Sequence, residues 1–346
     1  MVRHLPFAFI ALLASLPGVA ASNSPTSGPG YHLIKKLAIG GEGGWDYLTV
    51  DSAARRLYVT RSTRVIVLDA DSGARVGEIP NTAGVHGVAL ARELDRGFTS
   101  NGRSSTVTVF ELKSLKTLSV IKTTGDNPDA ILYDPASRRV FTFNGRGGNA
   151  TAIDAASGVV AGTVPLDGKP EFGVADGSGR VFVNVEDKSL IDVIDSRKLS
   201  VEMRWPLAPC EEPSGMAFDG KNRRLFVGCR NRMMAVVDAG SGRVVTTAPI
   251  GEGVDANAFD ESSGLAFASC GDGTLTVAHE DSPDKLTVVQ SAQTQRSART
   301  MALDEKTHNV FLAAAQFGPP PSPTPGEPRP RPAIVPGSFV VLVFGR

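Results

Sequence analysis

Seven polar side chains, which recur at intervals of about 40–45 residues, carry most of the capacity for chemistry in this chain. Four are carboxylates, and the set consists of Asp46, His86, Asp129, Glu171, Ser214, Asp255 and Arg299. Carboxylates that lie close together repel one another, so a cation, a proton or a basic side chain must offset the repulsion. If the fold brings these positions together, the sequence predicts a site for a small molecule or a cation.

A second set of positions lies about 15 residues further on in each copy, where the next strand is expected to end. It consists of Arg61, Asn101, Asn144, Val185, Cys229, Cys270 and Ala314. Carboxylate and amide oxygens are ligands that suit Ca²⁺ or Mg²⁺. We expect a divalent cation to be held by Asp129, Asn144, Glu171 and Asp255. We expect a small ligand to contact Asp46, Arg61, His86, Asn101, Ser214 and Arg299. The alternative is that both sets only cap turns and line a water-filled channel.

Catalytic chemistry has weaker support in the sequence. His86 is the only histidine among these positions, so a zinc site with three histidines is excluded there. Ser214 is a conceivable nucleophile opposite His86, but it lacks the Gly-x-Ser-x-Gly turn that exposes a catalytic serine. The two Trp residues of the chain do not form the repeated pattern that docks a quinone cofactor.

The elements that must position these residues belong to one repeated unit. The unit consists of an Asp-led turn, a strand with an aromatic residue, a strand that ends in Asp, and a Ser-Gly or equivalent turn, and three copies show it plainly. The aromatic residues mark seven copies at Tyr58, Phe98, Phe141, Phe182, Phe226, Phe267 and Phe311. Repeats of about 40–45 residues made of short strands are typical of propeller blades. The sequence therefore predicts an all-β, seven-bladed propeller over residues 31–346, whose channel mouth gathers both sets of polar residues.

The ring is expected to close through the two ends of the chain. The last repeat ends with Phe339–Phe344 and lacks an outer strand, and Tyr31–Ile39 has the pattern of that missing strand. Pairing the two removes the exposed edge of the ring.

The repeats resemble those of the YVTN family of seven-bladed propellers, which occurs in exported bacterial proteins. The resemblance rests on Tyr58-Val-Thr-Arg61, Phe98-Thr-Ser-Asn101 and Phe141-Thr-Phe-Asn144, and it covers the chain from Tyr31 onward. Arg61 departs from the motif, which usually has Asn there. The family contains unlike functions, so the resemblance implies the fold and export but no particular activity.

The first 30 residues predict export. Arg3 and His4 precede an apolar run that ends at Leu16, and small residues follow at Val19-Ala-Ala21. This pattern predicts a signal peptide over residues 1–21, followed by a flexible lead-in over 22–30 and a periplasmic or secreted mature protein without a membrane anchor. The chain has 36 basic and 36 acidic residues, so no net charge attracts nucleic acid or an anionic membrane.

An oxidising compartment allows disulfides among the three cysteines. We expect Cys210 and Cys229 to pair, because both lie at the mouth of the fifth repeat; Cys229 with Cys270 is the alternative pairing. A proline-rich insertion over residues 318–336 is expected on the same face, either as a semi-rigid rim of the mouth or as a connection without function.

Two classes of function are consistent with these residues. The first is an exported binding or interaction protein whose polar mouth takes a small molecule or a divalent cation. The second is a metal-dependent lactonase-type hydrolase or lyase that uses the same residues, with His86 as base and Arg299 positioning an anionic group.

Overall fold

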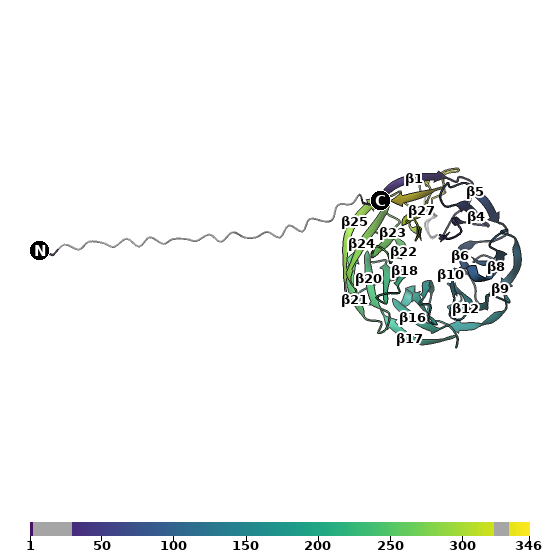
Figure 1. Cartoon of the computed structure of the whole chain (residues 1–346), viewed down its shortest axis with the longest axis horizontal. Coiled ribbons are helices and arrows are strands. Elements are labelled where there is room, and N and C mark those ends of the chain that lie inside the picture. The colour runs from purple at the N-terminus through teal and green to yellow at the C-terminus, as the bar shows by residue number, and fades with distance from the viewer. Residues whose placement is uncertain (3–29, 322–331) are drawn as a thin grey trace.

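The computed structural model describes residues 1–2, 30–321 and 332–346. Within these residues the strands form seven four-stranded antiparallel sheets, which are arranged as blades around a central axis (Figure 1). The predicted all-β, seven-bladed propeller is therefore confirmed. The predicted signal peptide and lead-in lie outside the described residues, apart from residues 1–2 and 30. No helix in the described part of the chain is long and apolar enough to cross a membrane.

The blades follow the chain in order, and each begins with its innermost strand. The first blade consists of β2 (Leu48–Asp51), β3 (Arg56–Arg61), β4 (Arg64–Asp69) and β5 (Arg75–Ile79). The second consists of β6 (Val85–Ala91), β7 (Arg96–Asn101), β8 (Thr106–Glu111) and β9 (Thr117–Lys122). The third consists of β10 (Pro128–Asp134), β11 (Arg139–Asn144), β12 (Asn149–Asp154) and β13 (Val160–Pro165). The fourth consists of β14 (Pro170–Ala175), β15 (Arg180–Val185), β16 (Leu190–Asp195) and β17 (Ser200–Pro206). The fifth consists of β18 (Pro213–Asp219), β19 (Arg224–Cys229), β20 (Met233–Asp238) and β21 (Val244–Pro249). The sixth consists of β22 (Val254–Asp260), β23 (Leu265–Cys270), β24 (Thr274–Ser282) and β25 (Lys285–Gln293). Two short 3₁₀ helices in the described residues connect strands, η1 (Arg92–Leu94) and η2 (Glu186–Lys188).

The seventh blade is built from both ends of the chain. It contains β26 (Thr300–Asp304), β27 (Asn309–Ala314), β28 (Val340–Gly345) and, outermost, β1 (His32–Ala38). β1 runs antiparallel to β28 from the pair His32–Gly345 to the pair Ala38–Val340. The predicted closure by the N-terminal strand is confirmed.

The repeated aromatic residues form the core between blades. All seven, from Tyr58 to Phe311, are at most 1% exposed. Blades are radial, so side chains that stand perpendicular to a sheet point at the neighbouring blade. Tyr58, for example, packs in one cluster with Phe110 of the next blade, and their ring centroids are 6.0 Å apart.

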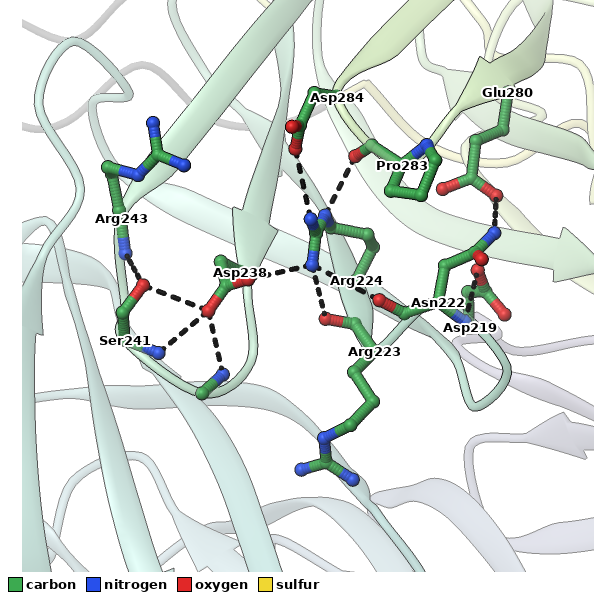
Figure 2. A network of polar contacts seen from close by, with 11 residues as sticks. Asp219, Asn222, Arg223, Arg224, Asp238, Ser241, Arg243, Glu280, Pro283 and Asp284 are labelled. Atoms are coloured by element: carbon green, nitrogen blue, oxygen red, sulfur yellow. Dashed lines mark hydrogen bonds and ion pairs between the residues drawn. The ribbon is translucent and has the colours of Figure 1, made fainter.

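Four of the second strands begin with an arginine that connects neighbouring blades on the face opposite the mouth. Arg96 of the second blade donates to the carbonyl of Ala155 in the third at 3.0 Å, and Arg139 of the third donates to Ser196 O in the fourth at 2.6 Å. Figure 2 shows the fifth-blade equivalent, where Arg224 donates to Pro283 O of the sixth blade at 2.7 Å. Although these arginines follow turns, their side chains bind the neighbouring blade.

A disulfide stabilises the fifth blade near the mouth. Cys210 and Cys229 are bonded, with their Cα atoms 5.4 Å apart, whereas Cys270 is free and buried. This is the pairing expected from the sequence. It ties the loop before β18 to the end of β19, and both segments border the mouth.

Candidate functional site

One end of the central channel opens into a cavity of about 570 Å³, which we call the funnel. All seven residues of the first set line it, namely Asp46, His86, Asp129, Glu171, Ser214, Asp255 and Arg299. Each comes from a different blade and lies at or just before the start of the innermost strand. The repeat therefore places one polar side chain per blade around a single opening.

Three of these side chains form a compact group on one side of the funnel. His86 Nδ1 lies 2.6 Å from Asp46 Oδ2 and 3.4 Å from Asp129 Oδ1. One potential ligand atom from each residue lies within 4.8 Å of the other two, a spacing that suits a shared metal ion. Burial lowers the pKa of His86, but the hydrogen bond to Asp46 and the charge of Asp129 outweigh it, so the net shift is upward. We call these three residues the triad.

Basic side chains hold the carboxylates on the other side. Lys169 Nζ donates to Glu171 Oε1 at 2.5 Å and also to Glu186. Arg299 Nε lies 3.2 Å from Asp255 Oδ2, and the Ser214 hydroxyl donates to the other oxygen of Asp255 at 3.2 Å.

Acidic groups outnumber basic ones in the funnel. Six carboxyl groups line it against three Lys or Arg side chains. Burial raises the pKa of Asp129 and of Asp255 to about 6 each, and His86 and Arg299 offset this only in part. Burial and the charge of Asp129 raise the pKa of Glu171 to about 7. The funnel thus holds more negative charge at neutral pH than its own side chains neutralise.

These shifts predict that the cation-free protein loses stability as the pH rises from about 4 to about 7. In that range the folded chain holds protons on Asp129, Glu171 and Asp255 that the unfolded chain has released, so raising the pH favours unfolding. His86, whose pKa is also raised, contributes in the same direction. We expect a decrease in the free energy of unfolding on the order of 1–3 kcal/mol between pH 5 and pH 8.

Urea unfolding in the presence of EDTA at these two pH values measures the effect. The variant Asp129→Asn/Asp255→Asn removes two of the titrating groups and should show a smaller decrease. A free energy of unfolding that increases from pH 5 to pH 8 in wild-type protein would contradict the raised pKa values.

Tyr47 forms the floor of the funnel. It is 7% exposed, its ring centroid lies 5.3 Å from that of Phe172, and it lines both the funnel and a deeper cavity of about 300 Å³ with mostly apolar walls. Burial and the funnel carboxylates raise the pKa of its phenol well above the usual range. The phenol of Tyr47 is therefore neutral and lies close to the carboxylates of the funnel.

The second set of predicted residues does not reach the funnel, which corrects the prediction for its polar members. Asn101 and Asn144 are fully buried in their blades, and their amides donate at 2.9 Å to Thr108 and Thr151. Arg61 is also buried; it stacks 3.8 Å from the ring centroid of Phe339 and donates to the carbonyls of residues 40 and 42.

The predicted positions of the second set are one residue too early in each second strand. Side chains alternate between the two faces of a strand, so the residue one step further is the one that leaves the blade. Six of the seven next residues line the cavities of the mouth, namely Ser62, Gly102, Glu186, Arg230, Gly271 and Ala315. Lys169, Glu186 and Tyr47 were missed in the sequence. Lys169 and Tyr47 are close neighbours of predicted positions, and a search one or two residues either side would have found all three.

The flanks of the proline-rich insertion lie beside the funnel. Phe317 and Ile334 pair through a β-bridge, and both line a cavity of about 940 Å³ that also includes Trp45 and Arg299. Residues 322–331 of the predicted rim lie outside the described residues.

Comparisons with known proteins identify the fold. The chain is similar to a chain in the crystal structure of the Mitotic Checkpoint Complex, with a TM-score of 0.72, 15% identity, and coverage of 90% of this chain and 96% of that one. It is also similar to a chain of the hydrazine synthase of Kuenenia stuttgartiensis, with a TM-score of 0.68, 12% identity, and coverage of 78% and 92%. No protein-family model and no curated protein matches the sequence. At these identities the likeness shows the propeller fold alone.

Proposed function

We propose that this protein is an exported, non-enzymatic binding protein that holds a divalent cation at the triad of Asp46, His86 and Asp129. The observation that carries the proposal is the convergence of one imidazole and two carboxylates from three blades within 4.8 Å. The excess of acidic groups in the funnel supports it, because a cation supplies the missing positive charge. The pattern of residues 1–21 and the resemblance to the YVTN family support the export that we propose.

The donor atoms favour particular ions. The sequence alone suggested Ca²⁺ or Mg²⁺ bound by oxygen ligands, but an imidazole nitrogen suits Zn²⁺ better, and the two carboxylates also suit Mn²⁺. Of the four ligands predicted from the sequence, the proposed site keeps Asp129 and adds Asp46 and His86, whereas Asn144 is not a ligand. Glu171 and Asp255 contribute negative charge from across the funnel. The proposal is therefore a mixed nitrogen and oxygen site.

A metal-dependent hydrolase or lyase of the lactonase type is the second candidate. Glu171 favours it, because a carboxyl with a pKa of about 7 is suited to act as a general base at neutral pH. Turnover of lactones or esters by cation-loaded protein, lost in Glu171→Gln, would support this candidate over simple binding.

Gly102 offers a specific test of the cation site. A Cβ atom at this position would lie 2.6 Å from His86 Nε2 and 2.8 Å from Asn127 Oδ1. Gly102→Ala should displace the imidazole from the triad and weaken cation binding about tenfold, which corresponds to about 1.4 kcal/mol. Isothermal titration with Mn²⁺ and Zn²⁺ measures the change.

Gly145→Ala is the matched control, because Gly145 occupies the equivalent position in the next blade. There the nearest atom to an added Cβ is Asn127 Nδ2 at 3.5 Å, an ordinary contact. Gly145→Ala should bind the cation as wild type does. Equal affinities for the Gly102→Ala and Gly145→Ala variants would remove His86 from the proposed site.

A further inference from the structure

A second cavity of the mouth adjoins the triad and differs from the funnel in charge. It has a volume of about 600 Å³, and Asp46 and His86 line both cavities. Its outer wall carries Arg103 and Arg146, from the loops that follow β7 and β11. We call this cavity the arginine groove.

The two arginines lack partners within the described residues. Arg103 and Arg146 are exposed, and neither side chain makes an ion pair or hydrogen bond there. The two arginines that line the funnel are paired, since Arg230 contacts Glu212 at 2.5 Å and Arg299 contacts Asp255 at 3.2 Å. The one carboxylate of the groove outside the triad, Asp126, accepts a hydrogen bond from Ser105 at 3.2 Å.

The floor of the groove is fixed by backbone hydrogen bonds between successive blades. The amide of Gly84 donates to Ser62 O at 2.6 Å, and the amide of Gly102 donates to Gly84 O at 2.8 Å. Gly84 has a φ of +70°, and a Cβ there would lie 2.6 Å from the Arg103 amide nitrogen. Glycine is thus required for this close approach. A floor fixed in this way lowers the entropic cost of ordering a ligand.

We propose that the arginine groove binds a small organic dicarboxylate, with one carboxylate on the cation of the triad and the other paired with Arg103 and Arg146. This inference rests on the proposed cation site. A bound divalent ion would add positive charge at Asp46 and His86, which line the same cavity as the guanidinium groups of Arg103 and Arg146. Guanidinium groups bind carboxylates through paired hydrogen bonds. The volume of the groove falls in the range typical of small-molecule sites.

Malonate and acetate are suitable probes, because they carry the same anionic group in two copies and in one. Titration of Zn²⁺-loaded protein should show malonate binding at least tenfold tighter than acetate. Arg103→Gln/Arg146→Gln should reduce malonate affinity at least tenfold and leave Zn²⁺ affinity unchanged. Arg243→Gln, an exposed arginine in the turn between β20 and β21 on the opposite face, is the control and should behave as wild type.

The outcomes separate this inference from the proposed function. Zn²⁺ binding with equal affinities for malonate and acetate, or with malonate affinity unaffected by the double variant, would overturn the dicarboxylate site and leave the cation site standing. Absence of binding by any divalent ion would overturn both. Inorganic phosphate binding that matches malonate and depends on the same two arginines would replace the dicarboxylate by a phosphate ligand and so reject the class proposed here.

Discussion

Replacing Asp46 and Asp129 by asparagine is expected to abolish the stabilisation that a divalent cation gives the native protein. A ligand that binds only the folded chain adds about 2.7 kcal/mol at a concentration one hundred times its dissociation constant. The double variant removes both carboxylate ligands of the triad and leaves only His86, so this increment should disappear. The cation-free variant should fold and be at least as stable as wild type at pH 8, because it loses two repelling charges.

Thermal unfolding with and without Mn²⁺ or Zn²⁺ measures the increment. Glu212→Gln is the matched control, because Glu212 lines the same funnel but is paired with Arg230 outside the triad. This variant should keep the full cation response. If it loses the response as completely as the double variant, the funnel attracts ions by its overall charge and the triad is not a site.

Deleting the chain before Gly44 is expected to abolish cooperative folding of the propeller. The deletion removes β1, leaves β28 as an unpaired edge, and exposes partners of the buried Tyr31 and Leu37. Burial of two large apolar side chains contributes about 3–6 kcal/mol, which is comparable to the whole stability of a typical domain, about 5–15 kcal/mol. Tyr31 also donates to His308 O at 2.8 Å and packs on Phe267, so blades six and seven both lose contacts.

A circular permutant provides the control for this deletion. His32 and Gly345 are register partners, so a short linker can join the two ends of the folded chain, with new termini between residues 40 and 43. The permutant keeps β1 beside β28 and should melt in one cooperative transition near that of the mature protein. A truncated chain that melts as the permutant does would show that the N-terminal strand does not hold the ring closed.

The architecture could be predicted from the sequence because the same strand and turn residues recur in the copies of the repeat. The aromatic of every second strand is buried between blades. In six of the seven blades, the turn after the innermost strand begins with an Asp that accepts turn amides, as Asp51 does from Ala54 at 3.0 Å. The register of the innermost strands was predicted well enough that all seven residues of the first set line the funnel. Repetition supplied this accuracy, since an error in one blade is visible against the other six.

The sequence could not give the side-chain directions at the ends of the second strands. Asn101 and Asn144 were expected at the mouth, but a shift of one residue moves a side chain to the other face of a sheet. The internal partners that take up these amides, such as Thr108 and Thr151, lie seven residues away on the neighbouring strand. The polarity of a side-chain amide does not show whether the amide hydrogen-bonds inside a blade or faces a ligand.

Contacts between blades also could not be predicted from the sequence. Arg224 is 11% exposed and binds the turn of the next blade, although its position in an Arg-Arg pair is typical of a solvated turn (Figure 2). Such contacts join residues about 60 positions apart, and no local pattern encodes them. Lys169 was missed for a different reason, because its contact with Glu186 joins two loops of one blade that are 17 residues apart.

Anomalous diffraction from crystals of the mature protein grown with Mn²⁺ or Zn²⁺ tests the cation site most directly. We predict a single strong peak within bonding distance of Asp46, His86 and Asp129, at about 2.0–2.2 Å from their ligand atoms. A peak at Glu171 and Asp255 instead, or a funnel without any peak under ion concentrations that saturate other surface sites, would contradict the proposed cation site.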